Sequence, residues 1–537
     1  MSDLSTQTQK LIHRYESWYN NNQAKGNLPT MHVDEIASRV AGFYEKIRTI
    51  VDWKEEHLMR RAAIIRKLKR RFLGWELNNS GKAEDVAEPL IMELIRGGHF
   101  PNDKIEESKI DEVQKIVNKY NFILQSNNEA SAKTKRGRLH FYNWILEIAA
   151  CEIEDILDPF TRGRALIDYM FEIMKARIMV AENALFDEDK NIQIYIAVQQ
   201  ALFKLDEPII TYHLLKYRIL GWNDPSPALL LEITKNIFKI WDIIEKDLSN
   251  PLAKKFYAVC EKYDTPFLLL GDILSHGNPS ETAKNISEPE VLEIQIKKTY
   301  NARLATLKKR LYRAALYSTL SILLTNIFSF FVLEIPLAKL ITGNFTPITI
   351  IVDILGPTLL MFFLTITVQT PSKSNLDMVV LETMKIAYQK ENTDTYLIKV
   401  TKKRGTALNA FINFIYLLGA VISFGLVYLI FKLAGFPRTS VVINILFVSL
   451  IMFAGLAIRK RARELSVEDE KRNLSGFVFD ILSLPVAETG KWFSNKWRQY
   501  NAIAAFFNAL IDMPFLIFVE FIERWRAFLK EKEEEIH

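Results

Sequence analysis

The chain has 537 residues, 49% of them apolar and 25% charged, which is too long for one ordinary domain. Its formal net charge of +6 is modest for this length and argues against a dedicated nucleic-acid-binding protein, whose domains are usually far more basic. The two cysteines, Cys151 and Cys260, lie far apart and belong to no metal or redox motif, so we expect two reduced, partly buried thiols.

Residues 1–28 are polar, include the run NNNQAKGN and carry no apolar leader, so we expect a flexible tail at a cytosolic N-terminus. From residue 29 to residue 286, apolar residues recur at three- and four-residue steps between Gly, Pro and Asn turn signals. Because alternating strand patterns are scarce, this region predicts an all-α cytosolic domain. We expect its later helices at roughly residues 83–96, 105–125, 131–157, 161–185, 189–204, 206–219, 226–247, 251–262 and 264–275.

The most basic stretch of this domain is MRRAAIIRKLKRRF, residues 59–72. On a helical wheel, most of its apolar residues share one face, and the cations that point away from it are Arg60, Arg66, Lys67, Arg70 and Arg71. These cations fit three interpretations: a solvated surface with scattered acidic partners, contact with anionic lipid headgroups, or contact with nucleic acid. Nucleic acid is disfavoured, because no aromatic residues are interleaved with the cations for base stacking.

One arginine of this stretch lies on the apolar face instead. Arg61 falls among the apolar residues of the same helical wheel. A buried guanidinium is costly unless it is paired, so we predict a buried ion pair between Arg61 and a carboxylate of another helix. The sequence does not identify that carboxylate.

Residues 287–313 predict a helical stalk. Ser287 and Glu290 have the spacing of a capping box, and Pro289 lies in the first turn, where proline is tolerated. No helix-breaking residue separates this segment from the apolar residues that follow. We therefore expect one continuous helix that joins the cytosolic domain to the first membrane span.

The region 314–458 predicts a transmembrane domain. It contains four apolar windows of about the 20 residues that a helix needs to cross a bilayer. We expect spans at about residues 314–333, 348–368, 408–431 and 440–458, with a cytosolic segment at 369–407 between the second and third spans.

The charges beside these windows predict their orientation. Basic residues are dense before the first span, between the second and third spans, and after the fourth span, and they are sparse in the other two loops. This alternation follows the positive-inside rule for four spans with both termini in the cytoplasm. Low cysteine content, many Lys, Ile and Asn residues and the missing organelle signal favour a bacterial cytoplasmic membrane.

The C-terminal region 459–537 predicts amphipathic helices in the plane of the membrane surface, followed by a charged tail. Two apolar stretches, 476–497 and 501–525, contain charged residues and proline, and a crossing by 501–525 would place basic residues on the outer side. Trp492, Trp497 and Trp525 suit the membrane interface. The alternative is that both stretches pack on the cytosolic ends of the bundle.

Three charged residues lie in or beside the predicted spans: Glu334, Asp353 and Lys432. Intramembrane charges are costly and are commonly functional. We expect Asp353 to pair with Lys432 or Lys339, either to join the spans to one another or to serve an ion or proton step.

No catalytic, cofactor-binding or metal-binding motif is present in the sequence. Asp272 and His276 lie four residues apart on one helix face, a spacing that fits a structural pair better than an acid–base pair. We therefore expect no cofactor, and favour a membrane scaffold or adaptor that presents its helical domain to a cytosolic protein partner. The alternatives are an oligomeric transport or channel subunit with Asp353 in its pathway, and a membrane enzyme with an unrecognised site. A homo-oligomer is compatible with each of these functions.

Overall fold

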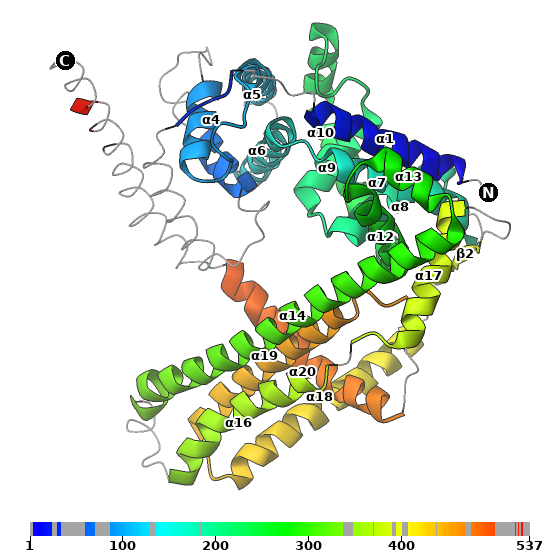
Figure 1. Ribbon diagram of the computed structural model, residues 1–537. Helices are drawn as coiled ribbons and strands as arrows, with labels where there is room; N and C mark the ends of the chain where they lie inside the picture. The colour runs from blue at the N-terminus through cyan, green and yellow to red at the C-terminus, as the bar shows by residue number, and fades with distance from the viewer. Residues whose placement is uncertain are drawn as a thin grey trace. The chain divides into compact units, whose positions relative to one another are not determined.

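The chain is helical apart from two short strands in the part that the structure describes (Figure 1). The computed structural model describes residues 4–23, 29–33, 60–69, 86–127, 135–181, 185–336, 347–368, 370–388, 394–399, 406–436, 438–467 and 474–499, together with residues 521, 525, 528 and 529. The chain divides into two compact units that each combine distant segments. The helical unit contains Gln9–Glu261, Asp394–Ile398 and Ala502–His537, and the bundle unit contains Met1–Thr8, Lys262–Thr393 and Lys399–Asn501.

The helices of the helical unit follow the apolar periodicity of the sequence closely. Residues 60–69 are helical, and the labelled helices are α4 (Ala87–Arg96), α5 (Lys109–Ser126), α6 (Lys135–Leu157), α7 (Thr161–Arg177), α8 (Asp187–Phe203), α9 (Glu207–Arg218), α10 (Pro227–Leu248) and α11 (Ala253–Lys262, whose last residue belongs to the bundle unit). The helix ends have ordinary causes. Ser226 caps α10 by accepting a hydrogen bond from the Leu229 amide, and the chain leaves α8 at Lys204 in the left-handed conformation, with φ of 50°.

The predicted flexible tail is wrong, because Thr6–Gln23 form helix α1. Its apolar residues Leu11 and Tyr15 are both only 2% exposed, so packing stabilises a helix in this polar sequence. Arg14 forms an ion pair with Asp168 of α7 at 2.6 Å. The few apolar residues of the segment lie on one helix face. This pattern is weak, and the polar composition around it favoured the prediction of a flexible tail.

The predicted helix 161–185 ends early, at Arg177. Residues Ile178–Val180 form strand β1, which pairs in parallel with strand β2, Tyr396–Ile398. The register aligns Ile178 with Tyr396 and Val180 with Ile398. Because β2 lies more than two hundred residues further along the chain, local periodicity could not predict this pairing.

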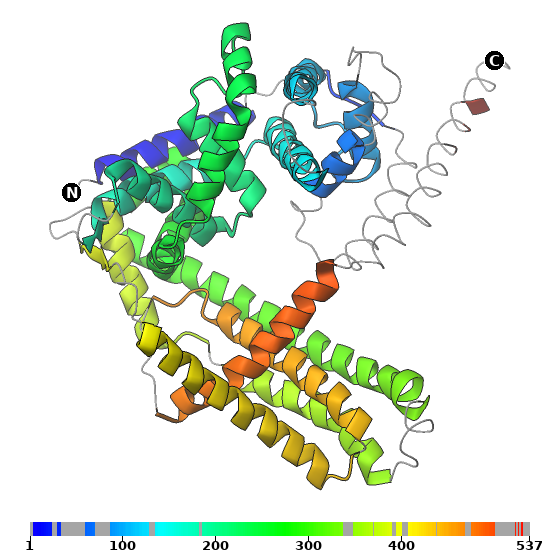
Figure 2. The ribbon, with the colours of Figure 1, turned by 180° about the vertical axis from the view of Figure 1, so that it is seen from behind.

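The bundle unit is built from long apolar helices and from shorter helices that pack beside them. They are α12 (Asp264–Ser275), α13 (Pro279–Ile286), α14 (Pro289–Ser329, followed by the π-helical turn η2, Phe330–Glu334), α16 (Pro347–Ile366), α17 (Lys373–Tyr388), α18 (Thr406–Leu433), α19 (Arg438–Ala462) and α20 (Leu474–Gln499). Figures 1 and 2 show α14, α16 and α19 side by side, with α20 crossing α18 and α19.

The continuous helix that the sequence predicts before the first span is confirmed by α14, which has 41 residues without a break. The predicted capping box is wrong. Ser287 follows the end of α13 and its hydroxyl donates to the Ala283 carbonyl, while Glu288 precedes α14 and makes no side-chain cap. Pro289 at the first helical position therefore begins the helix without that box.

Within the described part of the chain, three helices are long and apolar enough to cross a membrane: Pro289–Val332, Leu408–Leu433 and Val441–Ala462. They coincide with the first, third and fourth predicted spans. The second predicted span corresponds to α16, which contains a shorter apolar helical segment, Asp353–Ile366.

The chain passes from the helical unit to the bundle unit between Glu261 and Lys262, and the predicted domain boundary after residue 286 stays a prediction. Helices α12 and α17 pack on α14, and Asn375 of α17 fixes the arrangement. Its side-chain amide donates to the Tyr300 hydroxyl at 2.9 Å and to the Leu465 carbonyl at 2.8 Å. Asn375 is 1% exposed, so these bonds satisfy a buried polar group. Two further bonds join α12 and α13 to the bundle: Arg303 of α14 donates to Asp272 of α12, and the Tyr388 hydroxyl of α17 donates to the Ile286 carbonyl of α13.

The predicted amphipathic stretch 476–497 is helical and lies in α20. This helix packs on the central turns of α18 and α19 rather than on their ends. A Cβ atom on Gly490 would lie 2.0 Å from the Ser449 carbonyl oxygen, so the two backbones approach closely. The Tyr416 hydroxyl donates to Glu488 at 2.5 Å. The position of this helix in the plane of a membrane surface stays a prediction.

We predict that Gly490→Ala destabilises the bundle unit, because the added methyl group would collide with backbone that cannot move independently. The matched control is Gly425→Ala in α18, where nothing lies within 4 Å of the added Cβ atom. Both changes favour helix equally, so their difference reports the contact. We expect Gly490→Ala alone to lower, by at least several degrees, the temperature at which detergent-solubilised protein loses its size-exclusion peak. Equal behaviour of the two variants would contradict the α19–α20 contact.

Candidate functional site

Arg61 lies in the core of the helical unit and is 3% exposed. Its Nη2 atom lies 2.6 Å from Asp206 Oδ1, and its Nε atom lies 3.4 Å from Glu154 Oε2. The Nη1 group also donates to the Cys151 sulfur at 3.5 Å. The carboxylates that the sequence could not identify therefore come from α6 and from the residue before α9.

A second buried pair joins α5 to α6. The Lys119 ammonium donates to both oxygens of Glu152, at 2.6 and 2.8 Å, and to the Trp222 carbonyl at 2.8 Å. The Tyr120 hydroxyl donates to Glu152 at 2.6 Å. Burial lowers the pKa of Lys119 and raises that of Glu152, and each is opposed by the charge of the other group. All three donors of the ammonium are used, as a buried charge requires.

A third network surrounds Asp155 of α6. Arg164 of α7 donates to both Asp155 oxygens, at 2.9 and 2.7 Å, and the Tyr212 hydroxyl of α9 donates to Oδ2 at 3.2 Å. These partners outweigh burial, so the pKa of Asp155 lies below its usual value. Nearby His213 has Nδ1 at 2.5 Å from Gln199 Oε1, and burial lowers its pKa to about 3. His213 is therefore neutral.

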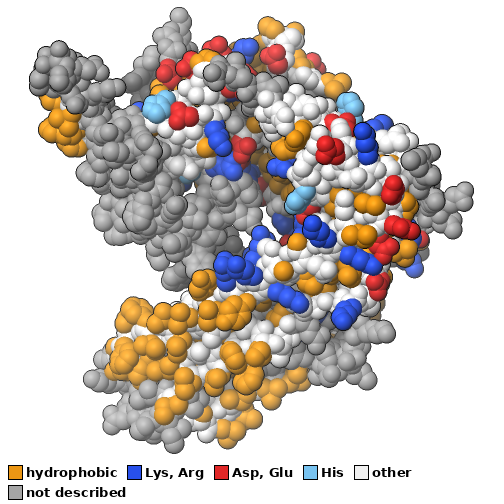
Figure 3. Space-filling view, viewed as in Figure 1, with side chains coloured by type: hydrophobic (Ala, Val, Ile, Leu, Met, Phe, Trp, Pro, Cys, Tyr) orange, Lys and Arg blue, Asp and Glu red, His pale blue; other side chains and the backbone are white. Residues whose placement is uncertain are grey.

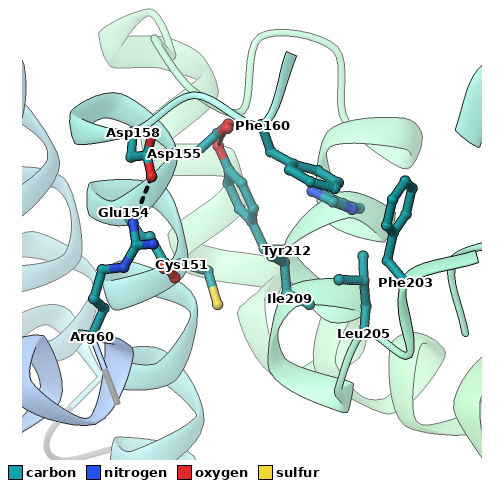
Figure 4. A pocket seen from close by; sticks show the side chains of 11 residues that line it. Arg60, Cys151, Glu154, Asp155, Asp158, Phe160, Phe203, Leu205, Ile209 and Tyr212 are labelled. Atoms are coloured by element: carbon teal, nitrogen blue, oxygen red, sulfur yellow. Dashed lines mark hydrogen bonds and ion pairs between the residues drawn. The ribbon is translucent and has the colours of Figure 1, made fainter. Parts of the chain in front are cut away.

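A pocket of about 270 Å³ lies between these networks and an apolar wall (Figure 4). Phe160 and Phe203 form part of that wall, with ring centroids 4.9 Å apart in edge-to-face geometry. The polar side carries Glu154, Asp155 and Asp158, and Arg60 donates to Asp158 at 2.5 Å. The complete lining is Arg60, Cys151, Glu154, Asp155, Asp158, Phe160, Phe203, Leu205, Ile209, Tyr212 and His213.

The chemistry of this pocket does not resemble a nucleophilic active site. Burial raises the pKa of Cys151 to about 12, so its thiol stays protonated. Glu154 differs from its neighbours, because burial raises its pKa to about 7 in spite of Arg61. Among the described residues, no group of three His, Cys, Asp or Glu side chains could hold a metal ion. The arrangement supports a structural core with one carboxyl group that titrates near neutral pH.

Polar groups also meet inside the bundle unit. The Asn444 amide of α19 donates to Asp353 Oδ1 of α16 at 2.5 Å, and the two residues are 1% and 3% exposed. Lys432, an expected partner of Asp353, is exposed in the last turn of α18, and its pairing with Asp353 stays a prediction. Glu334 ends η2, and Lys339, the other expected partner, lies outside the described residues.

The structure places the basic residues of the stretch 59–72 differently from one another. Lys67, expected to point away from the core, is 7% exposed and its Nζ atom donates to Glu93 at 2.9 Å. Arg60 pairs with Asp158, and Arg66 is half-buried. Arg70 and Arg71 lie outside the described residues. The described cations thus have intramolecular roles, and Lys67 is turned inward because Glu93 of α4 compensates its charge.

The three predicted interface tryptophans are described to different extents. Trp492 on α20 is 61% exposed, and Trp525 is 52% exposed beside Phe521, with ring centroids 6.1 Å apart. The side chain of Trp497 and nearly all of the stretch 501–525 lie outside the described residues.

Asp272 and His276 form no acid–base pair. Both oxygens of Asp272 accept hydrogen bonds from Arg303 of α14, and His276 Nδ1 lies 2.7 Å from the Asp272 backbone carbonyl. The Arg303–Asp272 ion pair therefore joins α12 to α14.

The Lys119–Glu152 pair was not predicted, although the sequence carries a signal for it. Lys119 lies three residues after Ile116 and four before Ile123, which places it on the apolar face of α5. The same argument that identified Arg61 applies to this lysine.

Comparisons with known proteins identify no relative. A scan against protein-family models finds no match, and searches of curated proteins and of solved structures find none either.

We predict that Glu152→Gln destabilises the helical unit by about 3 to 5 kcal/mol, because the Lys119 ammonium would lose its buried counter-charge. This corresponds to a melting temperature lower by about 10 °C. Cys151 and Cys260 are both buried thiols outside any disulfide, so thermal exposure of these thiols to a fluorogenic maleimide measures the unfolding. The matched control is Glu112→Gln in α5, the helix that carries Lys119, because its pair with Lys109 is partly exposed and should matter little. Equal melting of the two variants would contradict the role of the buried pair.

A second prediction concerns pH. The Glu154 carboxyl keeps its proton up to about pH 7 in the folded chain, against a usual pKa of 4.5. The folded state therefore binds more protons than the unfolded state between these values, so stability falls as pH rises through this window, by up to roughly 3 kcal/mol. Glu154→Gln removes this loss. We expect the difference in melting temperature between Glu154→Gln and the wild type, measured by circular dichroism, to be more favourable to the variant at pH 8 than at pH 5. A gain that is equal at both pH values would contradict the raised pKa.

Proposed function

We propose that this chain is an integral membrane protein with four spans and both termini in the cytoplasm, which presents its helical unit as a scaffold or adaptor. One observation carries the membrane part of the proposal: the outer surface of the bundle unit is apolar over several helices (Figure 3). Large apolar side chains that are about half exposed or more include Leu316, Leu320, Leu324 and Phe328 on α14, Leu359, Phe363 and Ile366 on α16, and Phe411, Leu417, Val421 and Ile430 on α18. Water solvates a surface of this kind poorly, whereas hydrocarbon solvates it well.

The proposal adds α16, the second span in chain order, to the three candidate spans named above. This helix has 20 residues, the length that crosses a bilayer core, and it packs against α14 and α19. Its one acidic residue, Asp353, is buried and accepts a hydrogen bond from Asn444. Because this bond joins α16 to α19, it supports a packing role for Asp353, and we prefer a scaffold to a transport subunit on that ground.

The scaffold part of the proposal is supported by the chemistry of the helical unit. Its buried charges are used to join helices, and its pocket holds a protonated thiol and a neutral histidine rather than an activated nucleophile. Phe186 and Leu220, which are 84% and 89% exposed, are the most exposed large apolar side chains of the described helical unit, and such side chains can anchor a protein partner.

Both parts can be tested in intact cells. For the topology, Asn344→Cys should react with an impermeant maleimide, and Lys390→Cys should react only after lysis, because the two positions lie on opposite sides of the membrane. The buried native thiols are replaced by serine in this background. Equal reaction of the two positions would exclude the four-span arrangement.

The scaffold role is tested in the same cells with a photoreactive amino acid at Leu220 or Phe186. We expect it to crosslink to a second protein, and a position on the apolar bundle surface, Leu324, serves as the control. Crosslinks at Leu220 and Phe186 that contain only this chain or lipid would contradict the adaptor function.

A further inference from the structure

We propose that one end of the bundle unit carries a binding site for anionic phospholipid headgroups, an inference that rests on the membrane insertion proposed above. The site is the basic rim, which we define as Lys308, Lys309, Arg310 and Arg313 of α14 together with Arg459, Lys460, Arg461 and Arg463 at the end of α19. None of these residues is among the cations that the sequence suggested for lipid contact.

The packing of two antiparallel helices creates the rim from segments about 150 residues apart. Leu311 of α14 and Ile458 of α19 belong to the same apolar cluster, which also contains Val368 just after α16. Leu311 lies within the basic segment of α14, and Ile458 directly precedes that of α19. Because both side chains pack in this one cluster, the two basic segments lie at the same level of the bundle.

The cations of α14 have no acidic partner on their own helix. Lys308, Lys309, Arg310 and Arg313 are exposed, and α14 contains no acidic residue from Ala302 to its end. Like charges at neighbouring helix positions repel one another and destabilise the helix. The basic residues in the last turn of α19 have a cause within their own helix, because the negative end of a helix dipole favours cations there. An external anion would compensate the repulsion on α14.

The surroundings of the rim identify the kind of anion. Exposed apolar side chains begin one turn after Arg313 on α14, with Leu316, Tyr317 and Leu320. Tyr312 and Tyr317, which are 71% and 63% exposed, lie at the border, where aromatic residues commonly meet a membrane interface. A lipid with a negative headgroup and apolar tails would contact both the basic rim and the apolar side chains next to it. Nucleic acid or free phosphate would contact the basic rim alone. Acidic residues also follow the rim: Glu464, which is exposed, and then Glu468, Asp469 and Glu470, which lie outside the described residues.

The test uses the full chain in a neutral detergent and counts bound lipid by native mass spectrometry. The probes are dioctanoyl phosphatidylglycerol, dioctanoyl phosphatidylcholine and inorganic phosphate. We expect binding of the phosphatidylglycerol alone, and we expect it to weaken as salt is added, because salt screens exposed charges. The variant with Lys308→Gln, Lys309→Gln, Arg310→Gln and Arg313→Gln should bind it at least about tenfold more weakly.

Two control variants make the result specific. Lys235→Gln, Lys239→Gln, Lys246→Gln and Lys254→Gln together remove four exposed cations of the helical unit and should leave binding unchanged. Exchanging lysine for arginine and arginine for lysine at the four α14 positions keeps the charge and should also keep binding.

The proposal is overturned if both lipids bind equally, if the glutamine variant binds like the wild type, or if inorganic phosphate displaces the lipid completely. These outcomes leave the chain in the membrane fraction. A chain found in the supernatant without detergent would instead contradict the proposed function, so the two failures are distinguishable.

Discussion

A charged side chain can be buried only when an opposite charge accompanies it, and this requirement organises the helical unit. Three acidic residues of α6 lie within four positions of one another, and each lies beside a cation from a different helix. Glu152 binds Lys119 of α5, Glu154 lies beside Arg61 of the helix 60–69, and Asp155 binds Arg164 of α7. The segment CEIEDIL of α6 therefore fixes the positions of its neighbours. Apolar packing alone would tolerate small rotations of these helices, whereas paired charges allow one arrangement.

The bundle unit depends on other interactions. Its candidate spans carry few charges, and several of the polar contacts between its helices are hydrogen bonds of asparagine, such as those of Asn375 and Asn444, beside the Arg303–Asp272 ion pair. Close backbone approach at Gly490 allows α20 to lie directly on α19. In lipid, burial of apolar side chains does not drive helices together, so close packing at small residues and amide hydrogen bonds are the contacts that join them. The two units thus use different physical means to hold helices together, as their contrasting compositions require.

The sequence predicted most helices of the chain within a few residues, because their apolar faces repeat with helical spacing. The apolar segments also stood out, and three of them have the length and composition of membrane spans. The errors share a cause. The helix α1, the pairing of β1 with β2 and the inward turn of Lys67 each depend on residues far away in sequence, which no local pattern reveals. Arg61 was recognisable because it broke an apolar face, but the choice of Glu154 and Asp206 depended on the fold.

The length of α14 has a mechanical consequence. A helix of 41 residues is about 60 Å long, which is roughly twice the thickness of a bilayer core. About half of it extends beyond its apolar part, where Arg303 and Tyr300 attach it to α12 and α17. Such a helix behaves as a lever with one arm among the candidate spans. A tilt of a few degrees at one end would displace the other by several ångströms, so the attached helices would register small changes in the thickness or tension of their surroundings.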